Sequence, residues 1–435
     1  MFLRIYAPLN HQSRTLCRMS VLLALAFGTP FVHAQSNGLT INEAIQLSLQ
    51  RSSLTKAANA SVLASRESAA KADQLPDPML KVGIDNLPVT GSDRYSTTSD
   101  FMTMRRVGIE QQWVSSDKRV ARSERAQRAV EMEESTYLES VAKVREETAK
   151  AWVNVLYGQR TLALVSGMEK EASDDLIAVN AAHRGAKANA SDVMQAQLSL
   201  SQAQDASSKN IQDLRNARLA LSRWTGMPAA IVSDESPKLI SHVPGLPIDE
   251  LEKYHPMLLT ARRAINLADA DSTVATRESN PDWSVEAAYS QRGSQYSNMV
   301  SFGISIPLPV NRAQKQNRDI AEKSALGTKA RMQYEEALRD LQTDIESQSS
   351  TLESLKERIQ QLNAQLLPAA SQQAELATAA YRSGEGSLSA VFNAKKMLLE
   401  RRLQIVELER EAALTWAALE YQVVPHDTVS VGETK

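Results

Sequence analysis

The sequence predicts a mainly α-helical chain that also supplies four β-strands to a membrane β-barrel. Long segments carry apolar residues alternately three and four positions apart, which indicates coiled-coil helices. Four short segments alternate between apolar and polar residues, and their polar positions are rich in glycine, as in strands around a water-filled lumen. The order strand, loop, strand, helix, turn, helix occurs twice, which indicates a tandem duplication.

The composition and the charge narrow the class of protein further. Of the 435 residues, 43% are hydrophobic but only 5% are aromatic, which favours long helices over one large compact core. The formal net charge is −2, so the chain lacks the basic field that nucleic acid attracts, and we expect no nucleic-acid partner.

Residues 1–34 are predicted to form a signal peptide for export. Arg14 and Arg18 precede the apolar stretch 21–27, and a small residue, Ala34, suits a cleavage site. The apolar stretch is too short to cross a bilayer, so we expect it to be removed and not to serve as an anchor. The single cysteine, Cys17, lies before the cleavage site, which predicts a mature chain without disulfides or thiolate metal sites.

Two structural repeats follow the predicted signal peptide. The first covers residues 35–245 and opens at Leu39–Glu43, and the second covers residues 246–425 and opens at the similar segment Leu246–Glu250. Residues 426–435 are expected to form a C-terminal tail. The elements of the first repeat are strands at about 79–86 and 104–113, a helical hairpin at about 116–225 and a linker at 226–245. The elements of the second are strands at about 282–290 and 299–308 and a helical hairpin at about 312–420.

The helical hairpins carry the strongest periodic signal. One seam of the second hairpin repeats every 3.5 residues on average and consists of Leu338, Leu341, Ile345, Gln348, Leu352, Leu355, Ile359, Leu362 and Leu366. A single helix from about Ser116 to about Ala182 is roughly 100 Å long at 1.5 Å per residue, far beyond the diameter of a globular domain. Ser191 is expected to cap the returning helix of the first hairpin, and Ser387 that of the second.

Four strands are too few to close a barrel, because about eight is the practical minimum. An open sheet leaves unpaired backbone groups at its two edges, which hydrocarbon does not tolerate. Three copies supply twelve strands and close the ring, while their hairpins continue it as an α-helical tunnel. The expected assembly is therefore a homotrimer in contact with membrane lipid.

At this point the layout resembles that of the TolC-type outer-membrane efflux proteins, over about Leu39 to Pro425. Asp77–Pro88 and Asp100–Gly108 resemble the branch of that family that serves heavy-metal exporters, the CzcC and CusC relatives. The resemblance implies a trimeric twelve-stranded barrel on an α-helical tunnel in the outer membrane of a Gram-negative cell. It also implies docking through a periplasmic adaptor, or membrane fusion protein, onto an inner-membrane RND pump.

The function that this resemblance implies is a passive conduit for heavy-metal cations, which leave the periplasm or cytoplasm for the outside. One alternative is an exit duct for organic drugs or a secreted protein. A second, from a different class, is a periplasmic coiled-coil adaptor or scaffold. A third, an enzyme of the cell envelope, finds no support in any catalytic motif.

The resemblance also implies two functional sites at the hairpin turns. Asp192 and Tyr381 stand where the family's tunnel is closed at its periplasmic end, although Asp192 alternatively serves only the start of its helix. The turns themselves are expected to dock the adaptor, through Arg184, Gly185, Ser383 and Gly384.

No catalytic or cofactor-binding pattern is present in the sequence. The six histidines lack metal-ligand spacing, and no glycine-rich phosphate loop follows a strand, so we expect no enzyme activity, cofactor or metal site. Met102 and Met104 are candidates for a transient copper or silver site, because thioethers are soft ligands. The simpler interpretation is that both are strand or loop residues.

Overall fold

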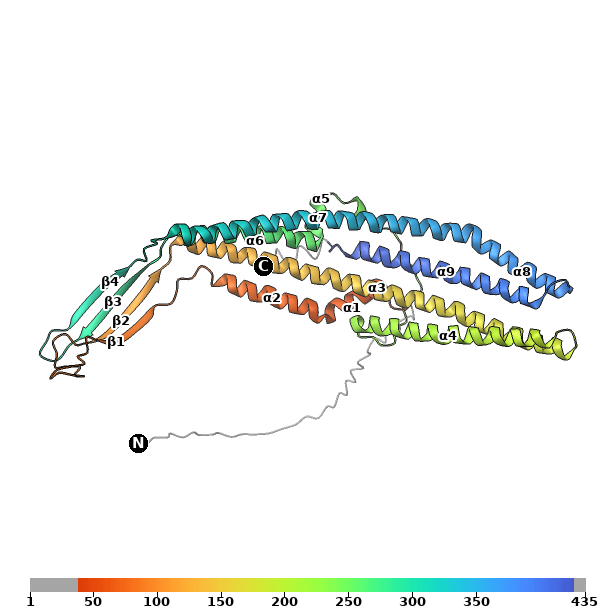
Figure 1. Ribbon diagram of the computed structural model, residues 1–435, viewed down its shortest axis with the longest axis horizontal. Helices are drawn as coiled ribbons and strands as arrows, with labels where there is room; N and C mark the ends of the chain where they lie inside the picture. Colours follow the sequence, from red (N-terminus) through yellow and green to blue (C-terminus); the bar gives the residue numbers. More distant parts are fainter. Residues whose placement is uncertain (1–37, 426–435) are drawn as a thin grey trace, which may run out of the picture. The chain divides into compact units, whose positions relative to one another are not determined.

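The computed structural model describes residues 38–425, which belong to one compact unit. The predicted signal peptide and the C-terminal tail at 426–435 lie outside these residues. The described part is mainly helical and contains one four-stranded antiparallel sheet, as the sequence predicts. Figure 1 shows the strands together beyond one end of the long helices.

Two short helices open the described chain, α1 (Ile41–Arg51) and α2 (Ser53–Ala70). Thr40 begins α1 with a capping box, because its Oγ1 accepts from the Glu43 amide and the Thr40 amide donates to Glu43 Oε2. Hydrogen bonds from Thr40 lower the pKa of Glu43. Ser52 ends α1 and caps α2, so these two helices meet at a single residue.

The sheet has the order β1-β2-β3-β4, with every neighbouring pair antiparallel. Its strands are β1 (Met79–Asp85), β2 (Met104–Trp113), β3 (Trp283–Gln291) and β4 (Met299–Ser305). The central pair, β2 and β3, brings together the two predicted repeats. The last strand ends at Ser305 and not near residue 308, because Pro307 has no N–H to donate to a ladder.

Two helical hairpins and two shorter helices form the rest of the fold. The first hairpin is α3 (Ser116–Arg184) and α4 (Ala190–Thr225), and α5 (Ile248–Tyr254) and α6 (Pro256–Glu278) precede β3. The second hairpin begins at Gln316, after a short 3-10 turn, and comprises α7 (Gln316–Gln361), α8 (Leu367–Ser383) and α9 (Leu388–Tyr421). Among the described residues, no helix is both long and apolar enough to cross a bilayer.

A π-helical turn, Leu362–Leu366, interrupts the outgoing helix of the second hairpin. Pro368 lies in the first turn of α8 and lacks the N–H that an α-helix would use four residues back. The predicted heptad seam therefore ends here, and Leu366 is 41% exposed.

The core lies where the two hairpins meet the linker at 226–245. Trp152 of α3 donates from Nε1 to the Leu39 carbonyl oxygen at 2.7 Å, and Trp416 of α9 donates to that of Ile240 at 2.9 Å. Both rings are buried, and in each the indole N–H is satisfied by one backbone carbonyl oxygen. Leu39 also bridges Val232, which ties the start of the first repeat to its end.

An ion-pair cluster joins the sheet to the helices. Lys118 of α3 is only 3% exposed and lies 2.7 Å from Asp282, which immediately precedes β3. Glu278 at the end of α6 lies 3.5 Å from the same ammonium group and also pairs with Arg122. A buried ammonium group needs such partners, so this joint holds the start of β3 against α3.

Candidate functional site

One face of the sheet is apolar and uncovered. The strand register places alternate residues of all four strands on this face, including Val82, Ile109, Tyr289 and Phe302. Val82 is 71% exposed and Phe302 is 81% exposed. A continuous apolar face of this kind is stable only against another apolar phase, such as lipid or a partner protein.

The opposite face of the sheet carries a network of charges. Lys81 of β1 pairs with Glu110 of β2 and lies 3.3 Å from Glu286 of β3. Glu286 also pairs with Arg106, which in turn lies 3.7 Å from Asp85. Three carboxylates therefore surround two cations, and the network carries one net negative charge. The register also places the small residues Gly83, Gly108 and Ser301 on this face, together with Met79, Met104 and Met299 at the strand ends.

Two tryptophans mark the end of the apolar face nearest the helices. Trp113 and Trp283 are paired across β2 and β3, and their rings stack with centroids 5.8 Å apart. Both are exposed, at 47% and 39%. Exposed tryptophans at the boundary of an apolar strand face are typical of a membrane–water interface.

The turn of the first hairpin is closed by Asn189 and Asp192. Asn189 Oδ1 accepts from the Asp192 amide at 2.9 Å, and Asp192 Oδ2 accepts from the Asn189 amide at 3.0 Å. The cap is thus Asn189 and not Ser191 as predicted, because a capping box needs an acidic or amide side chain three residues after the cap. Arg184 ends α3 and is exposed, and Gly185 has a φ of −85°. The left-handed residue of this turn is Ala186, with a φ of 55°.

The turn of the second hairpin has a different backbone. Gly384 ends α8 in the left-handed region with a φ of 82°, which a glycine adopts without strain. Ser383 donates from Oγ to the Ala380 carbonyl oxygen at 3.0 Å. Ser387 begins α9 and accepts from the Ala390 amide at 3.2 Å, which is the cap expected from the sequence.

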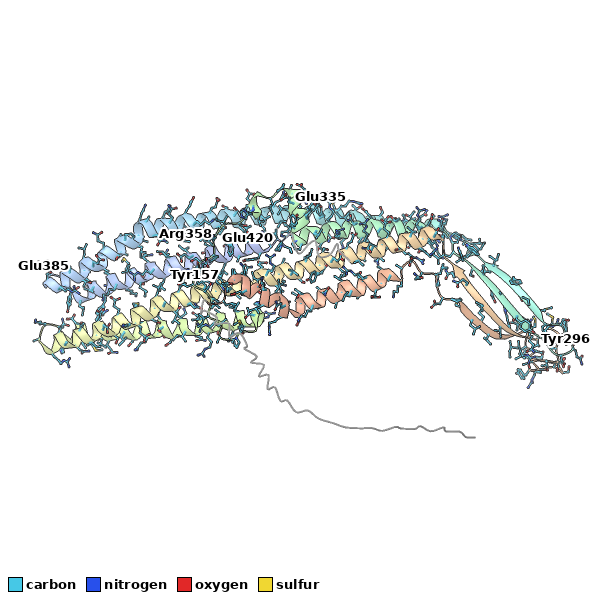
Figure 2. All side chains as sticks on the ribbon, turned by 180° about the vertical axis from the view of Figure 1, so that it is seen from behind. Tyr157, Tyr296, Glu335, Arg358, Glu385 and Glu420 are labelled. Carbon is cyan, nitrogen blue, oxygen red and sulfur yellow. The ribbon has the colours of Figure 1, made fainter. Side chains whose placement is uncertain are left out.

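The two turns pack together through a small apolar cluster. Val179 and Ala196 of the first hairpin contact Leu388 and Phe392 of the second, and Tyr381 packs against this cluster. Tyr381 therefore lies at the contact between hairpins, whereas Asp192 serves its own helix start. Within residues 38–425, no hydrogen bond joins these two gate candidates. In Figure 2, Glu385 marks this end of the hairpins, opposite the strand loop that holds Tyr296.

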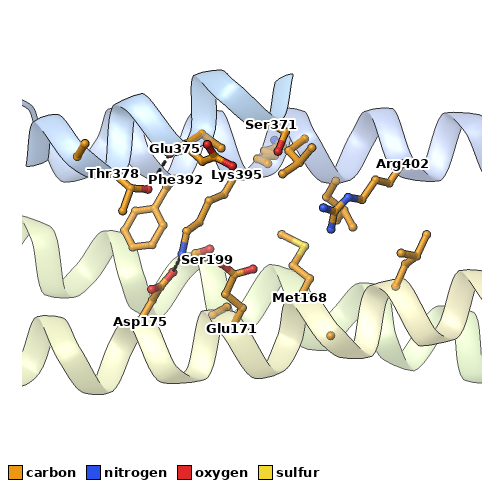
Figure 3. A pocket seen from close by; sticks show the side chains of 18 of the residues that line it. Met168, Glu171, Asp175, Ser199, Ser371, Glu375, Thr378, Phe392, Lys395 and Arg402 are labelled. Atoms are coloured by element: carbon orange, nitrogen blue, oxygen red, sulfur yellow. Dashed lines mark hydrogen bonds and ion pairs between the residues drawn. The ribbon is translucent and has the colours of Figure 1, made fainter. Parts of the chain in front are cut away.

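A groove of about 700 Å³ lies between the two hairpins, next to this cluster, and Phe392 lines both. Lys395 reaches across it from α9 to α3, and its Nζ lies 2.7 Å from Asp175 and 2.9 Å from Glu171 (Figure 3). Burial alone lowers the pKa of Lys395, but the hydrogen bonds to the two carboxylates outweigh it and raise that pKa. Sequence reasoning missed this contact, because nothing local marks a lysine whose partner is 220 residues away.

The two candidate metal ligands lie at the loop end of the sheet. Met102 is 49% exposed in the β1–β2 loop, and Met104 is the first residue of β2, opposite Asp85. Among the described residues, no group of three or more His, Cys, Asp or Glu side chains is arranged to hold a metal ion.

Comparisons with known proteins agree with the resemblance predicted from the sequence. Residues 248–421 match the outer membrane efflux protein family. The chain is 23% identical to the cobalt-zinc-cadmium resistance protein CzcC of Cupriavidus metallidurans over 334 residues. This alignment covers 76% of the present chain and 77% of CzcC.

Solved structures of similar fold include CusC and the outer membrane protein VceC of Vibrio cholerae. CusC superposes with a TM-score of 0.74 at 16% identity, over 87% of this chain and 90% of its own. VceC superposes with a TM-score of 0.73 at 17% identity, over 87% of this chain and 94% of its own. At these identities the structural matches show the fold alone.

Proposed function

Because the chain resembles the outer membrane efflux proteins, we propose that it is the outer-membrane channel of a tripartite RND-type efflux system. In this proposal three copies close a twelve-stranded barrel, and their hairpins continue it as a tunnel into the periplasm. The channel is a passive conduit, and the pump supplies the energy. The observation that carries the proposal is the two-faced sheet, apolar and exposed on one side and charged on the other.

The edges of the sheet support closure by identical copies. In one chain β1 and β4 each have a neighbour on one side only. Since four antiparallel strands alternate in direction, β4 of one copy runs antiparallel to β1 of the next, and the ladder continues without a change of type. The open edges, which hydrocarbon does not tolerate, disappear in the closed ring.

The two central strands are long enough to cross a membrane, whereas β1 and β4 have seven residues each. β2 has ten residues and β3 has nine, and a tilted transmembrane strand needs about 9–11. In the closed barrel the apolar face meets lipid, with Trp113 and Trp283 at the periplasmic interface. The charged face, with Lys81 and Glu286, lines the lumen, where water solvates it.

The cargo that we propose is a heavy-metal cation. The relative named for cobalt, zinc and cadmium resistance supports this choice, and so does the net negative charge of the network on the lumen face. A conduit needs no tight metal site, because tight binding slows exit. The hairpin turns, with Arg184, Gly185, Ser383 and Gly384, are proposed to contact the periplasmic adaptor.

The proposal is tested with the full-length chain expressed in a Gram-negative host. The chain should enter the outer-membrane fraction, and native mass spectrometry of the detergent-solubilised protein should give the mass of a trimer. A monomer that stays in solution without detergent refutes the channel and favours a periplasmic adaptor.

The cargo needs a separate test in the natural host. A strain lacking the gene should become sensitive to cobalt, zinc, cadmium, nickel, copper or silver and regain resistance when the gene is restored. Sensitivity to antibiotics alone, with normal metal resistance, identifies the drug duct instead.

A further inference from the structure

Two arginines lie at the end of the sheet farthest from the helices. Arg105 is the second residue of β2, and Arg292 directly follows β3, so both flank the loops that join the strands. The register aligns Arg105 with Ile84 on one side and Gln291 on the other. Since Val107 and Ile109 follow Arg105 at alternate positions, Arg105 shares the apolar face, at its outer boundary.

Neighbouring arginines on opposite faces of β2 have different partners. Arg106, on the charged face, pairs with Glu286 and lies 3.7 Å from Asp85. In the part of the chain that the structure describes, neither Arg105 nor Arg292 pairs with a carboxylate. Within the described residues, the sheet therefore neutralises Arg106 on its charged face. It leaves Arg105 on the apolar face, and Arg292 just beyond the end of β3, without a carboxylate partner.

Backbone and ring contacts fix both side chains at the loop end of the sheet. Arg105 Nη2 lies 3.5 Å from the Arg292 carbonyl oxygen, and Arg292 donates to the Phe101 carbonyl oxygen. The Arg292 guanidinium group also lies over the ring of Tyr296, 5.1 Å from its centroid. These contacts use few of the N–H donors and no charge, so the arginines keep the capacity to bind an anion.

We propose that Arg105 and Arg292 bind the phosphate of a lipid headgroup in the outer leaflet of the membrane. This inference rests on the proposed function, which places the loop end of the sheet on the outside. Phosphate fits because guanidinium groups bind it through two parallel charge-assisted hydrogen bonds. A lipid source fits because Arg105 stands on the face that meets lipid, where a charged side chain is tolerated only near the headgroups.

The test is native mass spectrometry of the full-length trimer in detergent, titrated with diphosphoryl lipid A. Wild-type trimers should bind one lipid per chain. The double variant Arg105→Gln/Arg292→Gln should keep the trimer mass. Its affinity for the lipid should fall at least about tenfold, because it loses the charge-assisted hydrogen bonds. The matched control, Arg318→Gln/Arg358→Gln, removes the same charge from exposed positions of α7 and should bind as wild type.

Two further probes identify the source of the phosphate. Dephosphorylated lipid A and inorganic phosphate should both bind wild-type trimers much more weakly than the phosphorylated lipid. Equal binding of the dephosphorylated lipid, equal binding of inorganic phosphate, or unchanged binding by the double variant each overturns the lipid site. Monomers in the spectrum before any lipid is added refute the proposed trimer instead, so the two failures are distinguishable. If the double variant does not assemble, Arg105→Gln alone is titrated against wild type and decides in the same way.

Discussion

Lys395 on α9 donates a 2.7 Å hydrogen bond to Asp175 on α3, and so joins the two helical hairpins of one chain across the groove between them. Both side chains are less than one-third exposed, so water screens the pair only in part. The contact lies close to the hairpin turns, where the proposed tunnel ends.

We expect this pair to hold the hairpins together with a measurable coupling energy. A double-mutant cycle with Lys395→Met and Asp175→Asn should give a coupling of about 1 kcal/mol in thermal or chemical unfolding. Lys396→Met is the matched control, because Lys396 is exposed and adjacent but has no ion-pair partner in the described chain. A coupling energy near zero, or an equal effect of the control, means that the pair does not join the hairpins.

The charge of Asp192 can be separated from its role in the capping box. Asp192→Asn keeps an oxygen that accepts from the Asn189 amide, whereas Asp192→Ala removes it. If the carboxylate closes the tunnel, both variants should raise the single-channel conductance of trimers in planar bilayers. If it serves only the helix, Asp192→Ala alone should lower stability and neither should change conductance.

Tyr381 allows the same separation at the second turn. Tyr381→Phe removes the hydroxyl group but keeps the ring against the cluster with Phe392. A hydroxyl that takes part in closing the tunnel predicts a higher conductance for Tyr381→Phe at unchanged stability. If the conductance of Tyr381→Phe equals that of wild type, the Tyr381 ring only packs against the cluster and its hydroxyl group does not close the tunnel.

The helices and strands were predictable because they depend on periodicity. A repeat of 3.5 residues marks α7, and a repeat of two marks the strands, and both are readable from one sequence. The ends of elements were less predictable. Ser191 was predicted as the cap, whereas Asn189 occupies that position. Several polar residues lie in this turn, and only the backbone geometry decides among them.

Contacts between distant segments were not predictable at all. Lys395 and Asp175 occupy ordinary polar positions of their helices, and neither position reveals the relative rotation of the two hairpins that brings them together. The π-helical turn before Pro368 was not predictable either. The sequence shows that Pro368 lacks an N–H, but not how the backbone rearranges its hydrogen bonds around that gap.

Two glycines of the sheet are expected to respond differently to a methyl group. A Cβ added to Gly108 of β2 would lie 2.8 Å from Ala288 Cβ of β3, whereas one added to Gly83 of β1 has nothing within 4 Å. Gly108→Ala should therefore cost about 1–3 kcal/mol through overpacking and lower the yield of folded trimer. Gly83→Ala, on the same face, should be close to neutral. Equal yields and melting temperatures of the two variants contradict this account.

The two hairpin turns should also differ. Gly384→Val should cost about 1–2 kcal/mol because its φ of 82° is left-handed, whereas Gly185→Val, at a φ of −85°, should not be strained. Unfolding measurements on both variants check the backbone. Adaptor-dependent export and crosslinking then check the docking proposal: a Gly185→Val protein of normal stability but weak export places the adaptor at this turn, and normal export by both variants excludes it.

His255, at the junction of α5 and α6, should make the stability of the folded chain depend on pH. Its side chain is 6% exposed, and burial lowers its pKa from 6.5 to about 4 despite an opposing hydrogen bond with Gln422. Above pH 6.5 the ring is neutral in both the folded and the unfolded chain and contributes no pH dependence. Between pH 6.5 and about 4 the unfolded chain binds the proton first, so the free energy of unfolding falls as the pH falls.

The size of that loss is about 3 kcal/mol over the whole window, since each unit of pKa corresponds to about 1.4 kcal/mol. Unfolding midpoints measured at pH 7.5 and at pH 5 should therefore differ more for wild type than for His255→Phe, which keeps a buried ring that cannot titrate. The exposed His242 gives the control, because His242→Phe should keep the wild-type difference. If His255→Phe retains the full wild-type difference, carboxylates elsewhere and not this imidazole cause the acid sensitivity.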